Sequence, residues 1–180
     1  IRDRASAESA AASFPELPTK AQRDEVFDRI DYNGNGSLSL AEIDKAIVEL
    51  WPQFDHKKAV LRAYKAADRN GDGFIRRREF RLLVAYVAYF HERWPQFERV
   101  ERSSTRNRLS LKAFLKGVTE VELGISRTEA EYDFHEIDEN EGGYVLFGEF
   151  CSWCARRHIG AMYEQAMSEA LTDLSLYTSP

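Results

Sequence analysis

The chain has 180 residues, of which 43% are hydrophobic and 31% are charged, a composition typical of a soluble globular protein. Its formal net charge of −5 argues against a general nucleic-acid binder, which would carry a basic face. No stretch approaches the roughly 18 consecutive apolar residues that a membrane-spanning helix requires.

Residues 1–18 are rich in Ala and Ser and contain Pro15 and Pro18, so we expect a flexible leader. Thr19, followed three residues later by Gln22, is typical of a capping box and predicts that the first helix begins here. Ser126 and Glu129 repeat this spacing and predict the start of a helix in the second half of the chain.

Four segments repeat one pattern, in which an amphipathic helix, a polar loop and a second amphipathic helix follow one another. Three of the loops begin at Asp31, Asp68 and Asp138. An aromatic residue lies four positions before each start, and apolar residues lie seven and twelve positions after it. The aromatic residues are Phe27, Tyr64 and Phe134. The residues seven positions after the start are Leu38, Ile75 and Val145, and those twelve positions after it are Ile43, Phe80 and Phe150.

The polar loops have the spacing of twelve-residue calcium loops. Such loops supply oxygen ligands from positions one, three, five, seven, nine and twelve, with glycine at position six. The first loop, 31–42, offers Asp31, Asn33, Asn35, the Ser37 carbonyl and Glu42, with Ser39 placed to hold a water. The second, 68–79, offers Asp68, Asn70, Asp72, the Phe74 carbonyl and Glu79. Both are predicted Ca²⁺ sites, with Mg²⁺ as the expected competitor.

The fourth loop, 138–149, is a weakened version of the same site. Asp138, Asn140, the Tyr144 carbonyl and Glu149 remain as candidate ligands. Gly142 and Leu146 replace the ligands at positions five and nine, so waters would have to fill those places at some cost in affinity.

The third unit lacks a calcium site. Counted from Phe97 its loop begins at Glu101, and counted back from Leu109 it begins at Arg102, which predicts one extra residue. Ala113 takes the place of the closing glutamate and three arginines fill the interior, so we expect this unit to bind no calcium and to support the fourth.

The expected fold is all-α, with four helix-loop-helix units of the EF-hand type in two paired lobes. Short β pairing should join the loops, with Leu38 beside Ile75 and Leu109 beside Val145. Pro52 and Pro95 exclude a continued helix and so should separate the units. The expected domains are the leader 1–18, an N-terminal pair 19–94, a C-terminal pair 95–158 and an amphipathic C-terminal helix and tail 159–180.

The last segment carries apolar residues at three- and four-residue spacing from Ile159 to Leu174. This stripe predicts a helix that either folds back onto the C-terminal lobe or docks on a partner. The helix over about 77–93 is apolar almost all round, which favours core packing over a partner groove.

Cys151 and Cys154 form a CxxC, but no further ligands stand at zinc spacing, so reduced thiols inside an intracellular protein are the favoured interpretation. The four histidines are scattered, and no nucleophile stands in an evident catalytic setting. The sequence therefore does not predict an enzyme.

The run Glu79 to Val84 with Tyr89-Phe90, together with Phe134 to Asp138 and Phe147 to Trp153, resembles the calflagins, the flagellar calcium-binding proteins. The resemblance covers roughly residues 20–158. It implies four EF-hands, a calcium-sensing role and a place in the flagellum, where that family is held at the membrane through an acylated N-terminus. In the family the C-terminal loops are the better calcium sites, whereas here the N-terminal loops are intact.

Together these features predict a calcium sensor of the flagellum or cilium with a dedicated protein partner. A constitutive structural part of the axoneme that uses the fold as a scaffold is the first alternative, and a calcium buffer is the second. Membrane contact would require an N-terminal lipid anchor.

Overall fold

The computed structural model describes residues 19–51, 54, 56–138 and 141–159. The expected leader 1–18 and the expected amphipathic segment after Ile159 lie outside the described residues, as do Pro52 and Asn140. No helix in the described ranges is long and apolar enough to cross a membrane.

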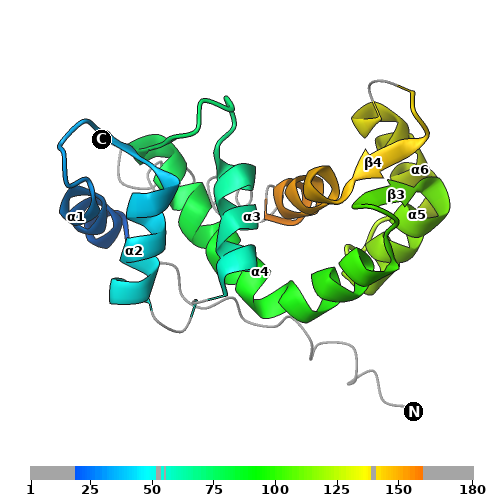
Figure 1. Ribbon diagram of the computed structural model, residues 1–180, viewed down its shortest axis with the longest axis horizontal. Coiled ribbons are helices and arrows are strands. Elements are labelled where there is room, and N and C mark those ends of the chain that lie inside the picture. Colours follow the sequence, from blue (N-terminus) through cyan, green and yellow to red (C-terminus); the bar gives the residue numbers. More distant parts are fainter. Residues whose placement is uncertain (1–18, 52–53, 55, 139–140, 160–180) are drawn as a thin grey trace, which may run out of the picture.

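The first pair of hands contains α1 (Lys20–Ile30), β1 (Ser37–Leu38), α2 (Leu40–Leu50), α3 (Lys57–Ala67) and β2 (Ile75–Arg76). The long helix α4 (Arg77–Ser103) leads into the second pair, made of β3 (Arg108–Ser110), α5 (Leu111–Glu120), α6 (Arg127–Ile137) and β4 (Tyr144–Leu146). A last helix follows β4 directly and is described over residues 147–159. The largely helical fold with two short strand pairs confirms the predicted class (Figure 1).

Helix starts are fixed by the residues that the sequence indicated. The Thr19 hydroxyl accepts a hydrogen bond from the Gln22 N–H, and the Gln22 side chain accepts one from the Thr19 N–H. Ser126 accepts from the Glu129 N–H in the same way at the start of α6. Each bond satisfies a backbone donor that the first turn of a helix leaves free.

The two strand pairs have the predicted register. β1 and β2 are antiparallel with Leu38 opposite Ile75, and β3 and β4 are antiparallel with Leu109 opposite Val145. All four of these side chains are fully buried. Each pairing therefore joins the loops of two hands and closes one end of the core beneath them.

Helix α4 continues through Pro95, so the prediction that a helix ends at this residue is wrong. Proline removes one backbone hydrogen bond to the residue four positions earlier, here His91. Both Pro95 and His91 are exposed, so water can reach the carbonyl that loses its partner. Trp94, Phe97 and Val100 are buried and hold this part of α4 on the core.

One hydrophobic cluster extends through both pairs of hands. Its centre is α4, whose residues 83–90 are all buried, which favours the core-packing interpretation of this helix. Aromatic rings pack on α4 in each pair of hands. Phe27 of α1 lies against Phe80, with 5.4 Å between centroids, and Phe150 of the last helix lies 6.2 Å from Phe97. The two pairs thus share a core along α4, which bends from one pair toward the other in Figure 1.

Candidate metal centres

The first loop already has its oxygens turned inward. Asp31, at position one, accepts hydrogen bonds from the Asn35 and Gly36 N–H groups at 3.1 and 2.8 Å. Glu42, at position twelve, accepts from the Ser39 N–H and hydroxyl at 2.8 and 2.7 Å. The Asn33 amide donates to the other Glu42 oxygen at 3.3 Å, which brings positions three and twelve together across the loop.

The second loop is built in the same way but contains a competitor. Asp68 accepts from the Gly73 N–H at 2.9 Å, and Glu79 accepts from the Arg76 N–H at 3.0 Å. Arg76 Nη2, from position nine, lies 2.6 Å from Asp72 Oδ2. The pKa of the Asp72 carboxyl lies below its ordinary value. Partial burial alone would raise this pKa, but the hydrogen bonds from Asn70 and Phe74 and the Arg76 guanidinium together lower it by more.

Tyr64 adds a contact that ligand spacing does not predict. Its hydroxyl donates to the carbonyl oxygen of Gly73, at position six of the second loop. Burial and the nearby Asp68 and Asp72 carboxylates raise the pKa of this phenol, so it stays protonated and able to donate. Tyr64, the aromatic residue before the loop, therefore packs in the core and also stabilises the turn of the loop through its hydrogen bond to Gly73.

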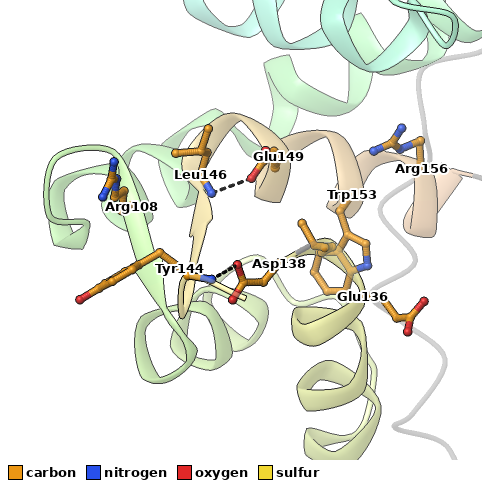
Figure 2. Close-up of a pocket in the computed structure, with 10 residues that line it drawn as sticks. Arg108, Glu136, Asp138, Tyr144, Leu146, Glu149, Trp153 and Arg156 are labelled. Atoms are coloured by element: carbon orange, nitrogen blue, oxygen red, sulfur yellow. Dashed lines mark hydrogen bonds between the residues drawn. The ribbon is translucent and has the colours of Figure 1, made fainter. Parts of the chain in front are cut away.

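The fourth loop keeps the backbone of an intact site. Asp138 is buried and accepts from the Gly142 and Gly143 N–H groups at 3.1 and 2.8 Å. Glu149 accepts from the Leu146 N–H at 2.8 Å, a bond that Figure 2 draws. Leu146, which replaces the position-nine ligand, is exposed. A cavity of about 810 Å³ opens beside these residues, with the Trp153 side chain in its wall.

Backbone conformation at two positions is common to these three loops. Positions four and six have positive φ, a region that glycine adopts without a steric penalty. These are Gly34 and Gly36, Gly71 and Gly73, and Glu141 and Gly143. The fourth loop thus holds a glutamate at 51° where the intact loops have glycine, which is a further departure from their pattern.

The third loop departs from the backbone geometry of the other three. Counted back from Leu109 its first position is Arg102, but α4 continues through Ser103, so the first two loop positions are helical. Arg106 and Asn107 have positive φ and make a tight turn, with the Thr105 and Arg108 backbones bonded to each other. Ala113 lies at position twelve, where its N–H donates to Ser110. In this register, from Arg102 to Ala113, neither end of the loop carries a carboxylate.

The donor sets of the first two loops fit calcium, which prefers six to eight oxygens in a compliant cage. In the second loop Asp68 Oδ1 is buried and has no hydrogen-bond donor among the described residues, a costly arrangement that a cation would relieve. Nowhere in the described ranges do three His, Cys, Asp or Glu side chains form a ready-made cluster. The loops therefore rely on Asn and backbone oxygens beside their carboxylates.

The CxxC pair plays no part in these sites. Cys151 and Cys154 are free and fully buried in the helix over 147–159. Burial raises the pKa of both thiols well above the ordinary value, so they remain protonated. Both cysteines are free, as predicted, and of the buried and half-exposed alternatives the structure shows the buried one.

Comparison with known proteins agrees with this geometry. The family model of the FCaBP EF-hand domain matches residues 11–87. Polcalcin Bet v 4 of Betula pendula is 37% identical over 65 residues, which are 34% of this chain and 69% of the polcalcin. The chain belongs to the EF-hand calcium-binding proteins.

Within that class it is related to the flagellar calcium-binding proteins. It is 29% identical over 154 residues to TB-44A of Trypanosoma brucei brucei, covering 78% of this chain and 38% of TB-44A. Identity to TB-24 of the same organism is 27%, and the match covers 78% of this chain and 70% of TB-24. The flagellar calcium-binding protein of Trypanosoma cruzi is 27% identical over 152 residues. The resemblance stated from the sequence is confirmed.

Proposed function

We propose that this protein is a calcium sensor in which the first and second loops bind Ca²⁺. The ligands would be Asp31, Asn33, Asn35, Ser37 and Glu42 in the first loop, and Asp68, Asn70, Asp72, Phe74 and Glu79 in the second. The observation that carries the proposal is the direct pairing of Leu38 with Ile75, which couples two loops that both have complete ligand sets. The fourth loop, through Asp138, Asn140, Tyr144 and Glu149, would be a weaker site.

We infer the location from the relatives and the kind of partner from the composition. Their names place them in the flagellum, so we extend a flagellar location to this chain. The two methionines lie outside the hands and the core is rich in aromatic rings, which favours one dedicated protein partner over many. Membrane contact would depend on an N-terminal lipid anchor.

A structural role is the second candidate, and one feature favours it. The third loop carries three arginines and lacks the ligand pattern of the others, and its hand shares one core with them along α4. A protein that used the fold mainly as a scaffold would need only this shared core and no calcium at the third loop.

A calcium buffer is a further alternative. It would bind calcium with little change in shape.

A calorimetric calcium titration at millimolar magnesium tests the proposal. We expect at least two sites in the range of about 10⁻⁷–10⁻⁵ M, as in sensor hands. Glu42→Gln and Glu79→Gln should each abolish one of them, while Glu25→Gln, on the exposed face of α1, is the matched control and should abolish none. No binding in that range would leave the scaffold as the function.

A second measurement separates a sensor from a buffer. Trp94 and Trp153 both lie against the core, so their fluorescence should report an opening of the hands. A sensor should also bind an apolar dye such as ANS only when calcium is present. Stoichiometric calcium binding without either change would identify a buffer.

A further inference from the structure

An apolar groove lies between α5 and α6, away from the metal loops. It has a volume of about 620 Å³ and is lined by Leu111, Leu115, Val118, Ile125 and Ala130. Leu111, Leu115 and Ile125 are only half-buried, although they pack against the core. The two helices are in contact and lie at one end of the molecule in Figure 1.

Both edges of this groove are basic. Lys112 and Lys116 lie one helical turn apart on the α5 side and are exposed, and neither forms an ion pair with another described residue. Arg127 stands on the α6 side, where its one ion pair within the described residues is with Glu131. An occupant with an apolar face and acidic edges would therefore match both the floor and the rims.

The described chain ends against α6, one of the two helices that form the groove. Arg157, two residues before that end, forms ion pairs with Glu129 and Asp133 of α6, with 3.2 Å between its Nε and Asp133 Oδ2. Glu129 is the direct neighbour of Ala130, which lines the groove. As a helix, the 21 residues after Ile159 would be about 30 Å long. A segment of this length is longer than the ten-residue helix α5, along which it would lie.

The sequence of that segment has the chemistry of the missing occupant. It contains Glu164, Glu169 and Asp173 and no basic residue. On a helix with 3.6 residues per turn, its apolar stripe is flanked on one edge by Glu169 and Asp173, which are four residues apart, and on the other by Glu164. This arrangement mirrors the lysine pair on one side of the groove and the single arginine on the other.

We propose that residues 160–174 dock as an amphipathic helix in the groove between α5 and α6 of the same chain. Glu169 and Asp173 lie beside Lys116 and Lys112, Glu164 lies beside Arg127, and the stripe that includes Met167 and Leu171 covers the half-buried leucines. The second pair of hands is then closed on its outer side by the chain's own tail. This proposal is independent of calcium sensing.

Zero-length carbodiimide crosslinking of the full chain, followed by mass spectrometry of the monomer, tests it. The reagent joins a lysine amine to a carboxylate only where the two are in contact. We expect links from Lys112 or Lys116 to Glu169 or Asp173 within one chain. Tail carboxylates linked instead to Lys45 or Lys57, linked only between two copies, or not linked at all would overturn the proposal.

Two variants test whether the crosslinks depend on docking of the apolar stripe and not only on chance proximity of lysines and carboxylates. Leu171→Asp places a charge in the stripe and leaves every reacting group intact, so the yield of these links should fall roughly fivefold or more. Leu176→Asp, which lies off the stripe, is the matched control and should keep the yield. An unchanged yield in Leu171→Asp would also overturn the docking. The crosslinks are measured with calcium and with chelator, so a chain that binds no calcium still tests this contact.

Discussion

The guanidinium of Arg62 lies over the ring of Phe147, with 5.1 Å between its Cζ and the ring centroid. Arg62 belongs to α3 in the second hand, and Phe147 begins the last helix in the fourth. The same guanidinium fills the space beside Gly148, where a Cβ would lie 2.8 Å from its Nη1. The two pairs of hands therefore meet directly at this point, in addition to sharing α4.

Replacing Arg62 with Ala should weaken this junction. A cation over an aromatic face contributes about 0.5–1 kcal/mol at a partly exposed site, so the free energy of unfolding should fall by about that amount. Urea denaturation measures it. Lys65→Ala, an exposed change on the same helix, should stay within about 0.5 kcal/mol of the parent. Equal effects from both variants would mean that the contact adds nothing to stability.

Replacing Arg76 with Ser should strengthen calcium binding at the second loop. The Arg76 guanidinium forms an ion pair with Asp72, a candidate ligand, with 2.6 Å between Nη2 and Oδ2. It also places a positive charge at position nine of the loop. Because a surface ion pair is weak and screened by salt, we expect a gain in affinity of roughly two- to fivefold, larger at low ionic strength. A calcium titration of the second site measures it.

Arg78→Ser is the matched control for that change. It removes the same charge from an exposed residue at position eleven of the same loop, but Arg78 is not paired with a candidate ligand in the described structure. It should raise the affinity less than Arg76→Ser. If the two variants gave the same gain, the effect would come from net charge rather than from release of Asp72.

The strand registers could be predicted from the sequence because one apolar residue stands at the eighth position of every loop. Leu38 and Ile75 can be buried together only if their loops pair at that position. Whether a helix continues through Pro95 could not be predicted in the same way. Proline locally opposes a helix, but the free-energy cost of its missing hydrogen bond depends on whether water reaches the carbonyl that loses its partner. The sequence did not reveal that its missing hydrogen bond would face water.

The candidate sites show a similar division. The candidate ligands follow from spacing alone, because only certain positions of such a loop point toward its centre. Contacts between side chains do not, and so the hold of Arg76 on Asp72 and of Tyr64 on Gly73 appears only in the structure. The sequence predicts one extra residue in the third loop, but it does not predict that α4 extends through Ser103.

Gly117→Ala should destabilise the second pair of hands although alanine favours helices. A Cβ at this buried position of α5 would lie 2.9 Å from Phe150 Cζ and 3.2 Å from Val100 Cγ1. Overpacking of this kind typically costs about 1–3 kcal/mol, more than the gain in helix propensity of about 1 kcal/mol. Thermal and urea unfolding measure the net loss. A more stable variant would mean that the Phe150 ring can move aside.

The His158 imidazole should make stability fall on acidification. Burial, together with the charge of Arg93, lowers its pKa below 6.5, and its ring lies 5.3 Å from that of Tyr89. Because the unfolded chain then binds the proton more tightly, the contribution is complete above about pH 6.5 and is lost as pH falls through the lowered pKa.

Unfolding free energies at about pH 7.5 and about pH 5.5, measured in chelator to remove linked metal binding, check this. In His158→Phe the ring contact with Tyr89 is retained and the protonation is removed. The decrease between the two pH values should therefore be smaller in the variant than in the parent. An equal decrease would assign the acid sensitivity to other groups.

Cys151 and Cys154 should resist a thiol reagent in the folded protein. Both are fully buried on the helix that carries Phe150 and Trp153, and burial raises the pKa of both, so access and thiolate formation each require that the helix open. Labelling with a chromogenic disulfide at about pH 8 should be roughly 100-fold or more slower in buffer than in denaturant. Rapid labelling of the native chain would show instead that this helix opens readily from α4, which would remove the buried face on which the fourth hand rests.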